Sequence, residues 1–175
     1  MNRSPAIALR HAGFTLVELL IVFFIGAILA AIAVPSLRGT LLNTRQSSAF
    51  GLVISDLNLA RGEAIKRNSR MLMCARNVAG TDCDANWQLG WVVCIEAAIA
   101  DTCAPPTVAV PNPVVVIRPA LDGNLTLVGS ANAIRFNPNS SQGAGGANAT
   151  LIVSGTWADA VARTATVAGT GNISR

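Results

Sequence analysis

The sequence predicts an α+β fold in which one long amino-terminal helix packs on an antiparallel β-sheet domain. An unbroken apolar run near the amino terminus leads into an amphipathic stretch with helical spacing, and one continuous helix accommodates both. Beyond residue 70, short β-like segments alternate with turn-forming residues. A helix followed by strands in this order indicates an α+β domain.

The first element is the apolar run from Phe14 to Val34, in which Glu18 is the sole charged residue. Such a helix spans roughly 31 Å, close to the hydrocarbon thickness of about 30 Å, so residues 14–35 are expected to cross a membrane. A buried core helix would show a polar face, and a secretory signal would have a shorter core without the acid. Arg3 and Arg10 predict a cytoplasmic amino terminus.

The second element, residues 36–70, continues the helix with an apolar stripe that we expect to pack on the domain. Pro35, between the two halves, lacks an N–H and predicts a kink or a short melted segment. The stripe has three-to-four spacing and comprises Leu37, Leu41, Val53, Leu57, Ala60 and Ala64.

The remaining elements are strands in residues 71–175. The "DGN" sequence, Asp122–Asn124, lies between two apolar stretches and predicts a hairpin there. The expected strands are Met71–Ala75, Trp87–Ile95, Val114–Ile117, Leu125–Val128, Ala133–Asn137, Ala149–Val153 and Thr164–Ala168.

The stretch "GFTLVELLIVFFIGAILAAIAVPSL" resembles the class III signal of type IV pilins and type II secretion pseudopilins. The resemblance implies that a prepilin peptidase removes a leader, residues 1–13, by cutting between Gly13 and Phe14, and N-methylates Phe14. It also implies a single-pass protein of the bacterial inner membrane with a periplasmic domain, which then enters a pilus or pseudopilus through helix contacts with other pilins.

Cleavage between Gly13 and Phe14 would provide a positively charged partner for Glu18. Cleavage creates an α-amine at Phe14, which is protonated near neutral pH and lies one helical turn away. A carboxylate in a membrane costs on the order of 3 kcal/mol or more unless it is paired. We expect Glu18 to pair with the amine of an adjacent subunit and to set the register of assembly, or else with its own amine near the headgroups.

A second resemblance is to the GspH/FimT branch, which includes FimT/FimU-like minor pilins, and it implies a GspH-like domain over residues 71–175. It is carried by "LARGEAIKRN", by "MLMCARN" with "DCDANWQLGWVVCIE", and by "IRFNPNSSQG". Many FimT-type chains end with a Gly-Arg-x-Arg-like strand, whereas this chain ends "GTGNISR".

The four cysteines lie beyond the span, on the oxidising side of the membrane. We favour disulfides Cys74–Cys83 and Cys94–Cys103, each closing a loop after a strand, with Cys74–Cys94 as the alternative. No C-x-x-C occurs and the sole histidine, His11, is in the leader, so neither a zinc site nor any cofactor is expected. No enzymatic signature is present, and catalysis is not expected.

Three functions are compatible with these features. The first is a minor pilin that helps prime type IV pilus assembly, and the second is the H-type pseudopilin of type II secretion. The third is DNA binding for natural transformation, which the resemblance implies through basic residues near the carboxyl terminus, here Arg163 and Arg175. The broken Gly-Arg-x-Arg pattern makes DNA a less favoured partner.

Overall fold

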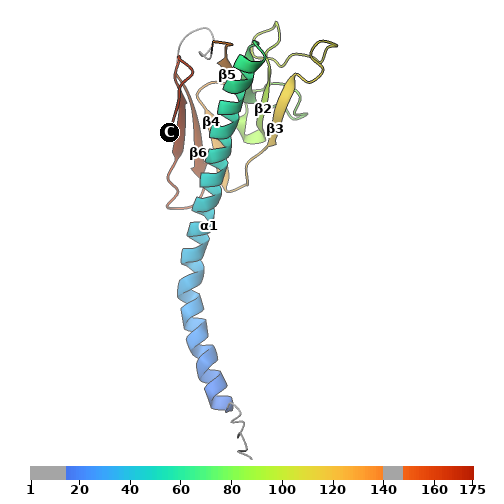
Figure 1. The fold of residues 1–175 in the computed structure, drawn as a ribbon. Coiled ribbons are helices and arrows are strands. Elements are labelled where there is room, and N and C mark those ends of the chain that lie inside the picture. Colours follow the sequence, from blue (N-terminus) through green and yellow to red (C-terminus); the bar gives the residue numbers. More distant parts are fainter. Residues whose placement is uncertain (1–14, 140–147) are drawn as a thin grey trace, which may run out of the picture. The chain divides into compact units, whose positions relative to one another are not determined.

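A computed structural model describes residues 15–139 and 148–175, apart from the side chains of residues 34–36. The expected cleavage site, Gly13–Phe14, lies outside the described residues. One α-helix, α1 (Leu16–Lys66), is followed by eight strands (Figure 1). The chain divides into two compact units, Met1–Thr40 and Leu41–Arg175.

The helix α1 is continuous through Pro35. The proline ring offers no N–H to the carbonyl of Ala31, so one hydrogen bond of the helix is missing there. The other backbone bonds of the helix keep α-helical geometry at this position. The short melted segment predicted at Pro35 is therefore wrong for the described chain, and the predicted kink stays a prediction.

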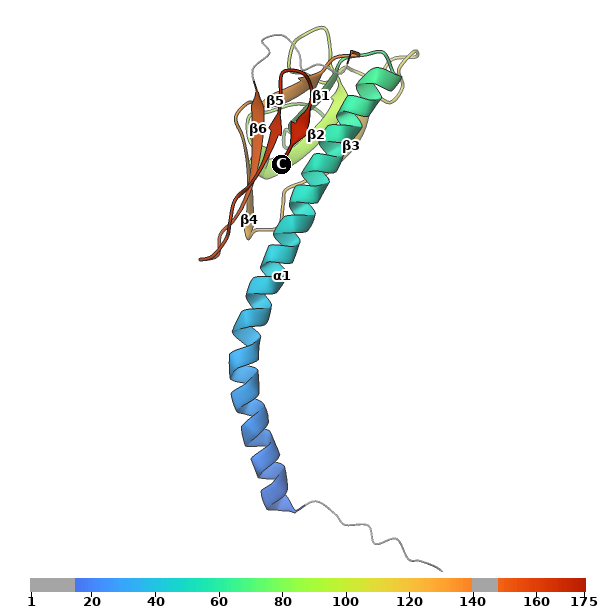
Figure 2. The ribbon, with the colours of Figure 1, turned by 60° about the vertical axis from the view of Figure 1, so that its left-hand side comes forward.

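The strands form two four-stranded antiparallel sheets that pack with the second half of α1 in the unit Leu41–Arg175 (Figure 2). The first sheet has the order β3-β2-β1-β5, with β1 Met71–Ala75, β2 Gly90–Ile95, β3 Val114–Pro119 and β5 Ala133–Phe136. The second has the order β4-β6-β7-β8, with β4 Leu125–Gly129, β6 Ala149–Gly155, β7 Arg163–Val167 and β8 Ile173–Ser174.

All seven expected strands correspond to observed ones, with two differences. The segment Trp87–Ile95 begins with a 3₁₀ turn, η1 (Trp87–Leu89), and β8 was not expected. The predicted hairpin at Asp122–Asn124 is wrong: the turn forms, but β3 pairs with β2 and β4 pairs with β6. The turn carries the chain from one sheet to the other, because burial across the domain, which no local motif reports, decides which strands pair.

The helix stripe packs on the domain only in its later part. Val53, Leu57 and Ala60 are fully buried, as expected. Leu41 is 53% exposed, so the prediction that it packs on the domain is wrong, whereas the prediction for Leu37, which belongs to the other compact unit, stays a prediction. The core contacts of α1 begin at Ala49, about two turns after Leu41.

The strands β1 and β2 are buried on both faces. Their inward side chains join α1 and the second sheet in the main core. Their outward side chains, Leu72, Cys74, Val92 and Cys94, form a second buried cluster. Cys83 and Cys103 pack over this cluster, so the two disulfide-closed loops cover a sheet face that would otherwise meet water.

Gly90 begins β2 at a position that excludes any side chain. Its φ is +102°, and a Cβ there would lie 2.2 Å from the carbonyl oxygen of Arg118. The glycine therefore lets β3 approach β2 closely, which accounts for the glycine of the "WQLGW" motif. Trp87 lies over Gly129, where a Cβ would meet the indole at 2.4 Å.

Candidate assembly site

The amino-terminal turn of α1 is capped by Thr15. Its Oγ1 accepts a hydrogen bond of 3.2 Å from the backbone N–H of Glu18, and its carbonyl accepts one of 3.1 Å from Leu19. Threonine followed three residues later by glutamate is the capping-box pattern, so Glu18 sits in the first turn, where the helix dipole favours an acid. The sequence reading assigned Thr15 no such role, although the T-x-x-E spacing carries it.

The predicted partner of Glu18, the amine of Phe14, lies outside the described residues. The structure therefore places the carboxylate at the start of the helix and leaves its pairing a prediction. The same turn presents Glu18 itself as an exposed residue, available to a group from another chain.

The first half of α1 has an exposed apolar surface on every side. An 18-residue window of the helix has a mean hydropathy of 2.8 with none of it buried, and by length and composition the helix can cross a membrane. A surface of this size requires lipid or other helices around it. The exposed side chains, each 49–75% accessible, are Leu16, Val17, Leu19, Leu20, Ile21, Val22, Phe23, Phe24, Ile25, Ile28, Leu29 and Ile32.

Two disulfides join Cys74 to Cys83 and Cys94 to Cys103. This is the favoured pairing from the sequence, and the alternative Cys74–Cys94 bond is not formed. The two loops are built alike, since each closes nine residues after its strand cysteine.

A buried carboxylate ties α1 to the first sheet. Asp56 accepts hydrogen bonds from Trp91 Nε1 at 2.9 Å and from Arg118 Nε and Nη2 at 2.8 and 3.0 Å. The Asp56 carboxylate raises the pKa of Arg118 above its ordinary value through these hydrogen bonds, which outweigh the opposite effect of burial. No local pattern in the sequence indicates this pairing, because the partners of Asp56 are 35 and 62 residues away.

A second buried carboxylate, Glu96, lies where β2 ends. Arg135 Nε donates to Glu96 Oε1 at 2.7 Å, and Arg70 Nε lies 3.2 Å from Oε2. Arg135 also pairs with Asp101 at 3.1 Å and so holds the Cys94–Cys103 loop against β5. Hydrogen bonding to Glu96 raises the pKa of Arg135, with burial opposing it.

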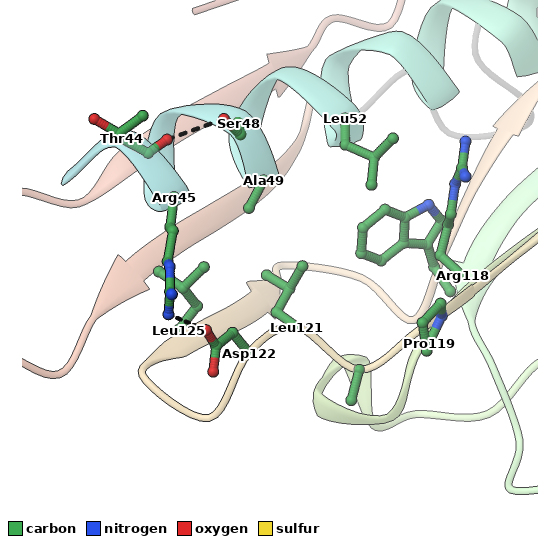
Figure 3. A pocket seen from close by; sticks show the side chains of 12 residues that line it. Thr44, Arg45, Ser48, Ala49, Leu52, Arg118, Pro119, Leu121, Asp122 and Leu125 are labelled. Carbon is green, nitrogen blue, oxygen red and sulfur yellow. Dashed lines mark hydrogen bonds and ion pairs between the residues drawn. The ribbon is translucent and has the colours of Figure 1, made fainter. Parts of the chain in front are cut away.

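A cavity of about 570 Å³ opens between α1 and the segment joining β3 to β4 (Figure 3). Ala49 and Leu52 from α1 face Leu121 of this segment across the cavity, and an exposed ion pair of 2.9 Å between Arg45 and Asp122 lies at one side (Figure 3). Its charged groups are thus engaged with each other or with Asp56.

The basic residues near the end of α1 are largely engaged within the domain. Glu63 pairs with Lys66 and with Arg67, and Arg76 Nε donates to the Leu89 carbonyl. Arg163 and Arg175 are both exposed: Arg163 begins β7, and Arg175 directly follows β8, which pairs with β7 through Thr166↔Ser174. The pairing of β7 with β8 therefore places both carboxyl-terminal candidates in the same part of the second sheet, whereas Lys66, Arg67 and Arg76 make their contacts within the domain.

Residues 51–171 match the family model described as type II transport protein GspH, and residues 9–34 match the prokaryotic N-terminal methylation motif. Two crystal forms of the Pseudomonas aeruginosa (strain PAO1) type IV minor pilin FimU have a similar fold. One gives a TM-score of 0.53 at 14% identity over 78% of this chain and 89% of that one. The other gives 0.50 at 17% identity over 73% and 90%. No curated protein matches the sequence.

A long helix with an exposed apolar first half, a methylation motif at its start and antiparallel sheets on its second half define a type IV pilin-like protein. The GspH model matches more than half of the sequence. The chain therefore belongs to the GspH family.

Proposed function

We propose that this chain is a minor pilin, a structural subunit that helps prime assembly of a type IV pilus-like filament. The observation that carries the proposal is the apolar surface of α1 from Leu16 to Ile32, which is exposed all round in the single chain. Such a helix requires lipid before assembly and neighbouring helices after it. The likeness in fold to the FimU minor pilin supports the same conclusion.

Processing and location follow from the same segment. Prepilin peptidase cuts between Gly13 and Phe14 and methylates Phe14, leaving the first half of α1 as a single inner-membrane span. The leader faces the cytoplasm, and the domain that carries both disulfides faces the oxidising periplasm. The mature chain then enters the filament beside other pilins. Replacing Gly13 with alanine should leave an uncut precursor, which mass measurement would reveal.

The register of assembly is the most specific part of this proposal. Glu18 lies in the first turn of α1, so after cleavage its carboxylate is about one turn from a new cation at Phe14. In a bundle of such helices, the amine of a neighbouring subunit can neutralise the acid. One buried polar pair of this kind fixes register in coiled coils.

The variant Glu18→Ala tests the register role. We expect it to be inserted and processed as the native chain is, but to be depleted from filaments sheared from the cells. Asp159→Ala is the matched control, because it removes an exposed carboxylate of the β domain and should leave incorporation unchanged. Normal incorporation of Glu18→Ala would show that the acid does not set register.

The alternative machine is type II secretion, in which the chain would act as the H-type pseudopilin. The family match is equally compatible with this role. Solubilising the membranes and identifying the subunits captured with the mature protein separates the two. Capture of type II secretion components in place of pilus subunits would refute the pilus role.

A second candidate function is DNA binding, favoured by two exposed cations of the second sheet, Arg163 at the start of β7 and Arg175 directly after β8. Phosphate contacts require clustered, accessible cations. A gel shift with residues 41–175 at low and moderate salt tests it. A shift that is lost in Arg163→Ala/Arg175→Ala supports DNA binding, and no shift at low salt rules it out.

A further inference from the structure

The four cysteines form one compact sulfur cluster. Their Sγ atoms all lie within 4.8 Å of one another, although the sequence spaces them nine to eleven residues apart. Cys74 and Cys94 are on adjacent strands and share the outward face of the sheet. Cys83 and Cys103 reach the same place because each loop returns to its own strand through a β-bridge, Arg76↔Cys83 and Glu96↔Cys103.

Hydrogen bonds that involve no sulfur also support this arrangement. Asp82 Oδ1 accepts hydrogen bonds of 2.7 Å from the N–H groups of both Cys83 and Cys103, so it joins the two loops. Each loop is also tied back to its strand, through Asp84 N to the Ala75 carbonyl and Ala104 N to the Ile95 carbonyl, each at 2.8 Å. These contacts involve no sulfur and are available to the reduced chain.

We propose that, with both disulfides reduced, the four cysteines form a tetrathiolate site for a thiophilic divalent ion of the zinc class. A tetrahedral ion with metal–sulfur bonds of about 2.3 Å places its sulfurs roughly 3.8 Å apart. The bonded sulfurs must separate and the two pairs must draw slightly closer, which rotation about the Cα–Cβ bonds provides. The Cα atoms, 5.5 and 5.6 Å apart within each pair, need not move far.

Reduction of the two disulfides requires a reductant, and a dithiol can supply the electrons. Each disulfide gains two electrons and two protons from one dithiol, which becomes a cyclic disulfide, and the four thiols then release four protons as they bind the ion. Ion binding and disulfide formation use the same sulfurs and exclude each other. Cys74 and Cys94 are buried, whereas Cys83 and Cys103 are partly exposed and give the ion a route of entry.

The ion would bind to the chain before its cysteines are oxidised. An ion held by all four thiolates keeps the two loops over the outward face of β1 and β2. It also occupies Cys74 and Cys94 together, and so blocks the cross-strand disulfide between them. The cysteine spacing typical of zinc sites does not reveal this site in the sequence, because no C-x-x-C pair is present and the four cysteines meet only in the folded sheet.

The test uses the full mature chain in detergent, reduced with a phosphine that binds the ion weakly and freed of excess reductant. Cobalt(II) serves as the probe, since tetrahedral thiolate coordination gives intense visible bands. We expect a single cobalt ion per chain, displaced by zinc, and no bands with the oxidised protein. Zinc should also slow reoxidation by oxidised glutathione.

Two variants keep the outcome decisive. Cys83→Ser/Cys103→Ser should lose the tetrathiolate bands, whereas Asp159→Ala should keep them. Should reduction unfold the domain, zinc is expected to restore its β-sheet circular dichroism. The proposal is overturned if the reduced chain binds no cobalt, if the double variant keeps the same bands, or if zinc neither binds nor restores the fold.

Discussion

At the scale of single residues, the interior of the domain depends on a carboxylate that the sequence presents as an ordinary helix residue. Asp56 faces the core from α1 and is 1% exposed. A charge buried this deeply is stable only when every acceptor has a donor. Trp91 and Arg118 supply three hydrogen bonds and thereby connect α1 with both β2 and β3.

Replacing Asp56 with alanine should therefore destabilise the domain by about 2–4 kcal/mol, because the Trp91 N–H and the Arg118 guanidinium both lose their partner. Urea unfolding followed by tryptophan fluorescence measures the change. Asp122→Ala is the matched control: its ion pair with Arg45 is solvent-exposed, and its loss should cost less than about 1 kcal/mol. Equal effects of the two substitutions would contradict the anchoring role.

Gly90 provides a second prediction at this scale. A Cβ at this position meets the Arg118 carbonyl and requires a strained backbone, so Gly90→Ala should cost about 2–5 kcal/mol. Gly123→Ala, where nothing lies within 4 Å of the added carbon, should change stability by roughly 0.5 kcal/mol or less. Thermal melts of both variants would compare them, and a harmless Gly90→Ala would show that β3 can move away.

At the scale of elements, the sequence predicted the long helix and seven strands because each depends on a local period. The buried positions Val53, Leu57 and Ala60 follow the helical repeat, and they were correctly assigned. Strand partners depend on contacts between distant segments. The Asp122–Asn124 turn therefore looked like a hairpin, although it links two sheets.

The candidate site likewise has some features that the sequence predicts and others that depend on contacts between distant segments. Local features could be predicted from the sequence, and these are the apolar helix, Glu18 and the order of the cysteines along the chain. The grouping of all four sulfurs and the partners of Asp56 and Glu96 depend on the sheet register, which pairs Leu72 with Cys94 and Met73 with Ile134. The sequence contains no period or motif that reports this register.

The last turns of α1 give a prediction on pH. Hydrogen bonding to Arg67, and then to Lys66, lowers the pKa of Glu63 below its ordinary value of 4.5, with burial opposing it. A folded-state pKa below the unfolded one stabilises the fold above the unfolded value, and this contribution is lost as the pH falls through the folded value. Stability should therefore decline below about pH 4.5 more steeply in the native chain than in Glu63→Gln.

The difference between the two should stay below about 1 kcal/mol, because Lys66 is 76% exposed and solvent screens its charge. Urea midpoints measured from pH 7 down to pH 3 would detect it. Parallel pH profiles would mean that the ion pairs of Glu63 are equally formed in the unfolded chain.

At the scale of the whole molecule, the chain combines a helix half that requires an apolar surrounding with a domain that carries its own core. Every buried hydrophobic residue among those described lies between Phe50 and Val167, within the compact unit Leu41–Arg175. Folding of this unit is therefore separable from any association made through residues 16–33.

The separation predicts that a chain beginning at Leu41 will be soluble without detergent and will unfold in one cooperative transition.

The boundary of the domain is set by a side chain that no apolar pattern reveals: Gln46 is 1% exposed and donates to the carbonyls of Val153 and Val161 at 3.0 and 2.8 Å. A chain beginning at Phe50 keeps every buried hydrophobic residue but leaves the buried Val153 carbonyl without this donor, so it should be less stable by about 1–3 kcal/mol. Gln46→Ala in the longer chain should reproduce most of that loss. If the two chains unfold at the same urea concentration, the hydrophobic core alone defines the domain, and Gln46 contributes nothing to it.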